Sequence, residues 1–241
     1  MPVAFEALFE PVRSLFFPAH CAHCACRVES GVDLCGDCAQ MIERIREPRC
    51  EACSQPFEGA VSSKFVCPNC REAQFSFQYA VAVVRSQRTI RDLVHRLKYG
   101  REMWLGRVLA GIQREGFSDP RLADRALDAL VPVPLHPRRL RERQFNQAAV
   151  LAEHLSVFSG IPVLECLLRS RYTDTQTRLG RKGRRQNLRN AFALRQNATV
   201  TGMDLLLVDD VLTTGSTLDA CAAILLEHGA RSVRALTVAR G

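Results

Sequence analysis

The 241-residue sequence predicts an α/β protein, in which a mostly parallel, doubly wound sheet follows a small cysteine-rich N-terminal domain. Three observations support this fold class. Eight of the eleven cysteines form four Cys-x-x-Cys pairs, all before residue 71. From residue 79 onward, short apolar runs alternate with segments of helical periodicity. Apolar residues make up 47% of the chain, which suits a folded core and argues against a disordered protein.

Residues 1–17 are predicted to form a short amphipathic helix, because apolar residues recur there at helical spacing. Glu6 and Glu10 interrupt the apolar pattern and no basic stretch precedes it, so the segment does not resemble a secretory leader. No apolar run approaches the roughly 18 residues of a transmembrane helix. We therefore expect a cytoplasmic protein without a membrane span. The formal net charge of +8 favours polyanionic partners, such as diphosphates or nucleic acid.

The four Cys-x-x-Cys pairs predict two structural zinc sites in a ribbon-like domain over residues 18–74. Two residues between thiolates let both sulfur atoms face one ion, and two such pairs complete the tetrahedral shell that zinc prefers. The predicted ligands are Cys21, Cys24, Cys35 and Cys38 for one site, and Cys50, Cys53, Cys67 and Cys70 for the other. Disulfides, which a reducing cytosol disfavours, and an iron–sulfur cluster are the alternatives. The spacing leaves sequential and interleaved ligation equally open.

Residues 75–241 are predicted to form the α/β domain. The alanine and valine run at 79–84 is typical of a buried strand, and the helical periodicity of 89–99 ends at Gly100. A second helix follows at 103–114, in which we interpret Trp104 as a core or interface residue. The same patterns continue the alternation, with strands at 130–134, 161–168, 204–210 and 232–239 and helices at 146–158 and 217–228.

The segment 205–217 carries the most specific signal. Its four leading apolar residues predict a buried strand, and Asp209 and Asp210 follow at the strand's C-terminal end, where open α/β sheets bind ligands. Carboxylates there can accept hydrogen bonds from a sugar diol or hold a divalent cation. The backbone N–H groups, the hydroxyls and the helix end that follow can hold a phosphate dianion. The predicted phosphate loop comprises Thr213, Thr214, Gly215, Ser216 and Thr217. The segment therefore predicts a ribose 5-phosphate site, against the alternative of a solvated acidic turn.

Two arginine-rich segments flank this site in the sequence. Guanidinium groups match phosphate oxygens in pairs, so we predict that the first segment, a loop over 136–147, binds diphosphate through Arg138, Arg139, Arg141 and Arg143. The second, at 169–187, is long, polar and glycine-containing, as a mobile lid would be. Its candidate residues are Arg171, Thr173, Gln176 and Arg185. A solvated basic surface is the alternative interpretation of both segments.

Five motifs resemble those of the ComF/GntX family and occur in the same order. They are Leu97-Lys98-Tyr99-Gly100-Arg101, the Val-Pro-Val-Pro-Leu run with Arg-x-Arg-x-Phe-Asn-Gln, Thr173-x-x-Gln176, Arg185-x-Asn187 with Ala191-Phe192, and the Asp-Asp-Val-Leu-Thr-Thr-Gly loop. That loop also resembles the phosphoribosyl-diphosphate (PRPP) signature of type I phosphoribosyltransferases. The resemblance implies a double zinc ribbon joined to such a domain, and a role in natural competence or the use of external DNA. One position differs, since Gln144 stands where the family usually has glycine.

The resemblance implies a transferase that works mainly by positioning and charge stabilisation. Asp209 and Asp210 would bind the ribose hydroxyls and stabilise developing positive charge, while the arginines and Mg²⁺ would stabilise the departing diphosphate. Lys98 is either a phosphate ligand or an ordinary helix-end lysine. Two other hypotheses are an adaptor for single-stranded DNA or a DNA helicase, with a regulatory or vestigial PRPP site, and a PRPP-sensing transcriptional regulator. The second is weaker because no helix-turn-helix pattern is apparent.

Overall fold

The computed structural model describes residues 19–59, 64–123, 126–170 and 190–241. The predicted N-terminal helix at 1–17 lies outside these ranges, as do the four lid candidates Arg171, Thr173, Gln176 and Arg185. None of the helices within the described ranges combines the length and the apolar character that crossing a membrane requires.

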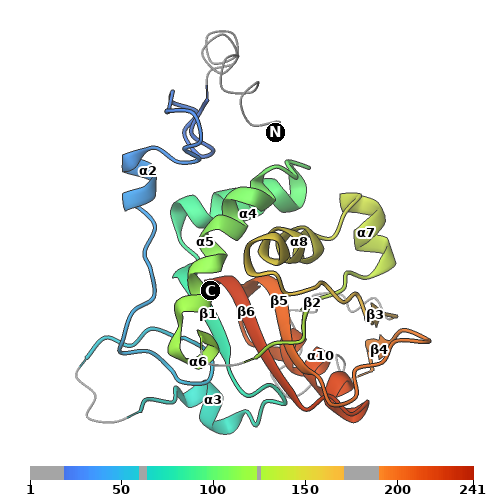
Figure 1. Ribbon diagram of the computed structural model, residues 1–241. Coiled ribbons are helices and arrows are strands. Elements are labelled where there is room, and N and C mark those ends of the chain that lie inside the picture. Colours follow the sequence, from blue (N-terminus) through green and yellow to red (C-terminus); the bar gives the residue numbers. More distant parts are fainter. Residues whose placement is uncertain (1–18, 60–63, 124–125, 171–189) are drawn as a thin grey trace.

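A four-stranded parallel sheet forms the centre of the molecule (Figure 1). Its strands are β1 (Ala80–Arg85), β2 (Ala129–Pro132), β5 (Asp204–Leu212) and β6 (Ser232–Arg240). They lie in the order β1-β6-β5-β2, and each neighbouring pair is parallel. All nine residues of β6 are buried, as expected for a strand covered on both faces. The predicted α/β fold class is confirmed.

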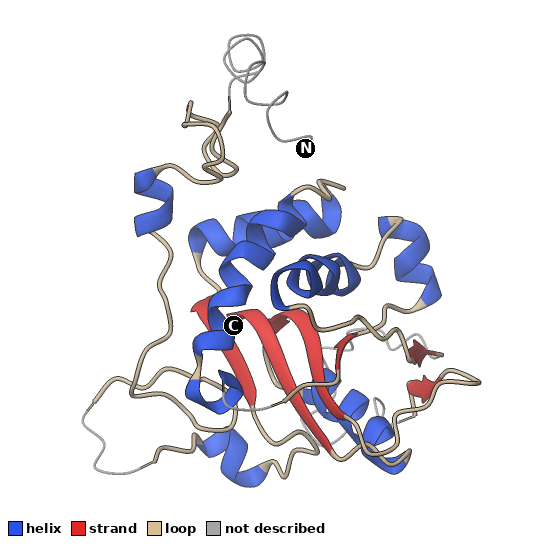
Figure 2. Cartoon of the chain, in the orientation of Figure 1, coloured by secondary structure: helices blue, strands red, loops and turns tan. Residues whose placement is uncertain are grey.

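Three long helices cover one face of the sheet: α4 (Arg88–Tyr99), α5 (Leu105–Gln113) and α8 (Gln147–Ser159). Alternate strand residues, such as Leu206, Val208 and Leu236, pack with the apolar faces of these helices in one buried cluster. The remaining short helices on this part of the chain are η1 (Arg114–Ser118), α6 (Pro120–Ala123) and α7 (Pro137–Arg143). Figure 2 shows the strands enclosed by helices.

The opposite face of the sheet is covered by α10 (Ser216–Glu227) and by the second half of the cysteine-rich segment. Leu205, Leu207 and Ala235, which alternate with the residues of the first face, belong to this second buried cluster. The cluster also contains Phe77 and the cysteines Cys50, Cys53, Cys67 and Cys70. On this face of the sheet, the cysteine-rich ribbon lies beside α10 and covers the strands as a second helix would.

The cysteine-rich segment itself contains two single-turn helices, α2 (Gly36–Gln40) and α3 (Pro68–Glu72). Each begins directly after a cysteine, Cys35 or Cys67, in extended conformation. Each then carries the second cysteine of its pair in the first turn. This local geometry brings the two sulfur atoms of a Cys-x-x-Cys pair to the same side of the backbone.

One strand prediction for the α/β domain was wrong in its bounds and pairing. The predicted strand at 161–168 is only β3 (Leu167–Arg169), which pairs antiparallel with β4 (Phe192–Leu194) in a separate small sheet. Pro162 cannot donate a ladder hydrogen bond, and the segment around it makes only a short bridge to β2. Of the two interpretations of Trp104, the core one is excluded, because the residue precedes α5 and is 51% exposed, and the interface one stays a prediction.

Candidate functional site

A pocket of about 440 Å³ opens at the C-terminal ends of β5 and β2. Its walls come from the outer face of α4, the segment after β2, the end of β5 and the loop that leads to α10. Four predicted site residues besides the arginines line it, namely Asp209, Asp210, Thr213 and Thr217. The pocket therefore lies where parallel sheets commonly bind ligands.

The two carboxylates at the end of β5 differ in environment. Asp210 is buried, with 3% exposed, and its Oδ2 lies 2.9 Å from the Nζ of Lys98. Asp209 is partly accessible, and its Oδ1 accepts a hydrogen bond from the backbone N–H of Asp210 at 2.9 Å. Burial, together with the neighbouring Asp210 charge, raises the pKa of Asp209 to about 7. One carboxylate is thus neutralised by a lysine, and the other is ready to exchange a proton near neutral pH.

The loop from Thr213 to Thr217 turns sharply into α10. Gly215 precedes the helix with φ +80°, a conformation that side-chain-bearing residues rarely adopt. The hydroxyls of Thr214 and Ser216 lie 3.0 Å apart at the exposed turn. Because α10 is twelve residues long and begins here, its unpaired N–H groups and dipole favour an anion at this point.

The first arginine-rich segment is a helix and not the predicted loop. Pro137 occupies its first turn, the side chain of His136 accepts a hydrogen bond from the Arg138 backbone N–H, and α7 then runs to Arg143. Gln144 follows with φ +72° and donates its N–H to the Leu140 carbonyl. Glycine adopts this left-handed conformation without strain, which suits the glycine that the ComF/GntX family usually has at the position of Gln144.

Helix α7 separates the four arginines that we predicted to act together. Arg138 and Arg139 lie 3.3 and 3.2 Å from Glu142 and point along the exposed helix surface. Arg143 is the member of this set that lines the pocket. It donates to Gln147 at 2.8 Å and its guanidinium lies 5.1 Å from the centre of the Tyr99 ring. Its buried Nε has no hydrogen-bond partner among the described residues, which leaves a donor for an anionic ligand.

Sequence reasoning singled out Lys98 but missed the polar face of α4 to which it belongs, and this face forms one pocket wall. Arg91, His95, Lys98 and Tyr99 line the pocket. Their spacing of three to four residues was a visible signal, since it places them on one helical face opposite the apolar one. The rings of His95 and Tyr99 lie 4.8 Å apart, and Tyr99 is 58% exposed. This wall combines positive charge with flat aromatic surface.

Among the described residues, the groups of side chains suited to a metal ion are the two predicted cysteine sets. Within each set the four sulfur atoms lie within 4.8 Å of one another. The sulfur atoms of Cys24 and Cys35 are 3.7 Å apart, and those of Cys53 and Cys67 are 3.8 Å apart. A tetrahedral zinc with Zn–S bonds of about 2.3 Å would place its sulfurs about 3.8 Å apart, whereas a disulfide needs about 2.05 Å. The geometry fits zinc, with sequential ligation.

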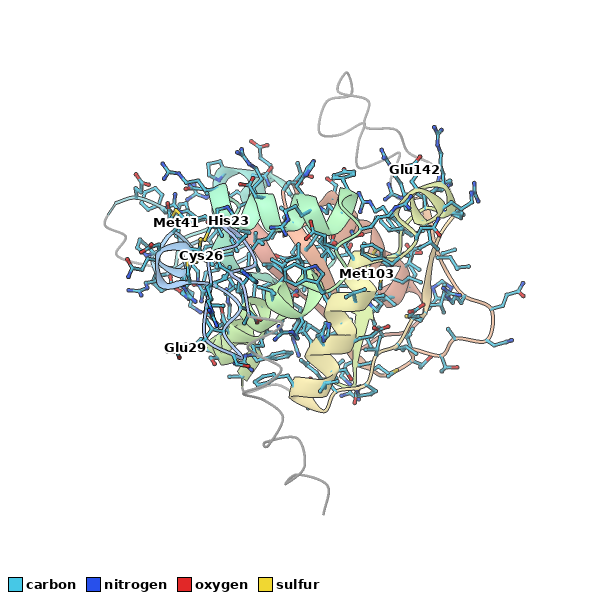
Figure 3. All side chains as sticks on the ribbon, turned by 90° about the horizontal axis from the view of Figure 1, so that it is seen from above. His23, Cys26, Glu29, Met41, Met103 and Glu142 are labelled. Carbon is cyan, nitrogen blue, oxygen red and sulfur yellow. The ribbon has the colours of Figure 1, made fainter. Side chains whose placement is uncertain are left out.

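The two clusters differ in exposure. All four cysteines of the second cluster are buried, but Cys24 of the first is exposed and Cys35 is partly exposed. His23 and Cys26 lie close to the first cluster without joining the set of four (Figure 3). The Nδ1 of His23 is 3.3 Å from the sulfur of Cys38. The first site thus has two cysteines at the surface, although Ala22 beside Cys21 packs into the cluster of α4 and α5, whereas the second site lies wholly in the core.

Comparison with known proteins agrees with both halves of this architecture. Residues 12–71 match the double zinc ribbon domain family, and residues 142–241 match the phosphoribosyl transferase domain family. Competence protein F of Haemophilus influenzae is 31% identical over 230 residues, covering 93% of this chain and 98% of that protein. The chain belongs to the competence protein F and YhgH family. The DNA utilization protein YhgH of Escherichia coli K12 is 32% identical over 217 residues, covering 86% of this chain and 90% of that protein.

More distant similarity extends to a solved structure. The adenine phosphoribosyltransferase of Leishmania tarentolae is 15% identical and aligns with a TM-score of 0.35, over 57% of this chain and 58% of that one. The family assignment rests on the sequence relatives and on the two domain families.

Proposed function

We propose that this protein binds PRPP, or another ribose 5-phosphate compound, at the end of β5 and transfers the phosphoribosyl group to an acceptor. The observation that carries the proposal is the convergence of an acidic pair and a helix N-terminus on one pocket. Asp209 and Asp210 supply acceptors for the two ribose hydroxyls. Thr213 and Thr217, with the loop between them, supply N–H and O–H donors for the 5-phosphate.

Cationic side chains on the pocket walls suit the diphosphate of PRPP. Arg143 has a buried, unpartnered Nε and Lys98 already lies beside the carboxylates, so both are placed to stabilise negative charge on a departing diphosphate. Magnesium bound to the diphosphate would neutralise further charge on the leaving group. The exposed positions of Arg138 and Arg139 favour a role in attracting anions over direct contact. Asp209 would stabilise positive charge that develops on the ribose ring.

The aromatic wall favours a flat acceptor. Tyr99 presents over half of its surface to solvent at the pocket edge, with His95 beside it and the Arg143 guanidinium over its ring. A planar heterocycle could stack on the exposed part of this aromatic surface, next to the cation. Nucleobases are the corresponding class of acceptor.

Two measurements test this function on the zinc-loaded, full-length protein. Calorimetric titration with PRPP and Mg²⁺ should show saturable binding to one site per chain, and Lys98→Ala should weaken it, because a charged contact contributes about 1.5–3 kcal/mol. Phosphorus NMR should then reveal diphosphate release when an acceptor base is present. The absence of PRPP binding to folded wild-type protein would refute the proposal.

A second candidate function is an adaptor that binds single-stranded DNA. The observation that favours it is an exposed corner where Met103 and Trp104 follow Tyr99, and where the Arg96 guanidinium lies 6.0 Å from the centre of the Trp104 ring. Aromatic rings beside arginines are surfaces on which unpaired bases stack. The relatives' names, competence protein and DNA utilization protein, point the same way. Binding of a labelled single strand should then fall in Trp104→Ala and decline steeply with salt.

A further inference from the structure

The second cysteine cluster is built into the same core as the candidate ligand site. Its cysteines belong to one buried apolar cluster with Leu212, which ends β5, and Leu218, in the first turn of α10. These two leucines bracket the phosphate loop in the chain. The shape of the loop therefore depends on a core that includes the cysteine ribbon.

Hydrogen bonds fix this ribbon to the edge of the sheet. The backbone N–H of Ala80, the first residue of β1, donates to the Ala52 carbonyl at 2.9 Å. The Ala80 carbonyl accepts the hydroxyl of buried Ser54, also at 2.9 Å. Residues 52 and 54 lie within and directly after the Cys50–Cys53 turn. The turn that would hold the metal is thus hydrogen-bonded to the first residue of β1.

A buried ion cluster provides a second attachment. Asp119 lies 2.7 Å from Arg49 of the ribbon and 2.8 Å from Arg121 of α6. Arg121 also donates to the carbonyl of Glu51 at 2.6 Å. Because these groups are withdrawn from water and mutually paired, displacing the ribbon would leave charges buried without partners.

The chain that leaves this ribbon touches the phosphate loop directly. Phe75, five residues after Cys70, lies against Gly215: a Cβ added to that glycine would be 3.0 Å from the Phe75 ring. The next residue, Ser76, donates its backbone N–H to Asp219 of the first α10 turn at 2.7 Å. Phe75 is held in turn by stacking on buried Phe77, with ring centres 4.6 Å apart. The segment that follows the ribbon therefore packs directly against the phosphate loop and the start of α10.

The first cluster has a different neighbourhood. Its ribbon rests on the outside of α4 and α5, where His23 lies 3.5 Å from Asp92, and Asp33 pairs with Arg107. Asp92 is 56% exposed, so this contact is a surface one. Seen from above, His23 and Cys26 lie at one end of the molecule and Glu142 of α7 lies at the other (Figure 3).

We propose that the metal of the second cluster holds the phosphate loop in its binding shape, through Phe75 and Ser76, and that the metal of the first cluster has no such role. The shape of the phosphate loop then depends on one zinc site and is independent of the other. The proposal makes Phe75 a positioning residue for the 5-phosphate. The proposal depends on the proposed function only for the identity of the ligand, because the coupling between the metal site and the loop is a property of the protein alone.

The test compares two matched double variants of the full chain, Cys67→Ser with Cys70→Ser, and Cys21→Ser with Cys24→Ser. Metal analysis should give two zinc ions in the wild type and one in each variant. The second-cluster variant should show faster amide hydrogen exchange over residues 213–217 and at least tenfold weaker PRPP binding. The first-cluster variant should match the wild type in exchange over residues 213–217. Equal exchange and affinity in both variants would overturn the proposal.

Single substitutions cover the case in which the second-cluster variant does not fold. Phe75→Ala should keep both zinc ions yet speed exchange at 213–217 and weaken PRPP binding about tenfold, while Phe75→Tyr should restore both. Phe57→Ala is the control, because Phe57 is an aromatic of the same ribbon that packs on Phe65. Unchanged exchange in Phe75→Ala would refute the coupling. Failure of wild-type PRPP binding alone would refute only the proposed function, because the exchange measurement needs no ligand.

Discussion

Replacing Asp209 with asparagine should make the folded protein more stable and less able to bind its ligand. Burial and the neighbouring carboxylate raise the pKa of Asp209 from an ordinary 3.8 to about 7. Between these two values the folded state holds a proton that the unfolded state has released. Folding therefore loses stability as pH rises through this window, and a neutral asparagine escapes the loss.

The size of the effect follows from the shift. The difference between 3.8 and about 7, at 1.36 kcal/mol for each pH unit, limits the loss of folding free energy above pH 7 to about 4 kcal/mol. Asparagine keeps an oxygen for the hydrogen bond from the backbone N–H of residue 210. The pKa of about 7 already includes the favourable charges of Lys98 and Arg143, so they reduce the figure no further. Because Asp209 is partly accessible and solvent screens its charge, we expect a gain of about 1–3 kcal/mol at pH 8 and almost none at pH 4.

Urea denaturation at pH 4 and pH 8 measures this prediction, with Asp210→Asn as the matched control. Asp210 is the ion-pair partner of Lys98, so its loss leaves a partly buried ammonium without a counter-charge. That variant should be destabilised at pH 8 by about 1–3 kcal/mol. Both variants should bind PRPP more weakly. If Asp209→Asn is destabilised at pH 8, or is stabilised equally at both pH values, the reasoning is refuted.

Further predictions concern the loop, the arginines and pH. Gly215→Ala should abolish PRPP binding and lower the free energy of unfolding by about 1–3 kcal/mol, because φ is +80° and the new Cβ meets an aromatic ring at 3.0 Å. In the same denaturation assay, Gly111→Ala should raise the free energy of unfolding by up to about 1 kcal/mol, because this helical glycine has open space around it. Calorimetry should show PRPP affinity reduced about tenfold or more in Arg143→Ala and nearly unchanged in Arg138→Ala, and equal losses would contradict the assignment. Wild-type affinity should rise as pH increases through about 7, because ionised Asp209 accepts stronger hydrogen bonds from ribose hydroxyls than the protonated form does, and Asp209→Asn should lack this rise.

Local patterns predicted most of the α/β domain. The strands at β1, β5 and β6 and the helices α4, α8 and α10 were foreseen within a few residues, because buried strands and amphipathic helices leave periodic signals. The segment 161–168 failed because Pro162 breaks the ladder that its apolar composition suggested. The helix α7 was missed because arginine density outweighed a helix-start signal that the sequence did contain, Pro137 after a capping residue.

The candidate site was only partly predictable. The carboxylate pair and the phosphate loop are contiguous in the chain, so a single motif reveals them. The wall formed by α4 depends on how that helix lies over the sheet, which no local pattern specifies. Contact between the second cysteine ribbon and α10 was hidden for the same reason, because Ser76 and Asp219 are 143 positions apart. The boundaries proposed for the ribbon, 18–74, and for the larger domain, 75–241, describe chain segments, while the packed core crosses them.

The pocket at the end of β5 is proposed to recognise a ribose 5-phosphate through its diol and its phosphate together. Calorimetric titration of the zinc-loaded protein with ribose 5-phosphate and with 2-deoxyribose 5-phosphate tests it most directly. The deoxy compound should bind about tenfold more weakly or worse, because it lacks one hydroxyl for the carboxylate pair, a loss of about 1–3 kcal/mol. Equal affinities, or no binding of ribose 5-phosphate at all, would contradict the account.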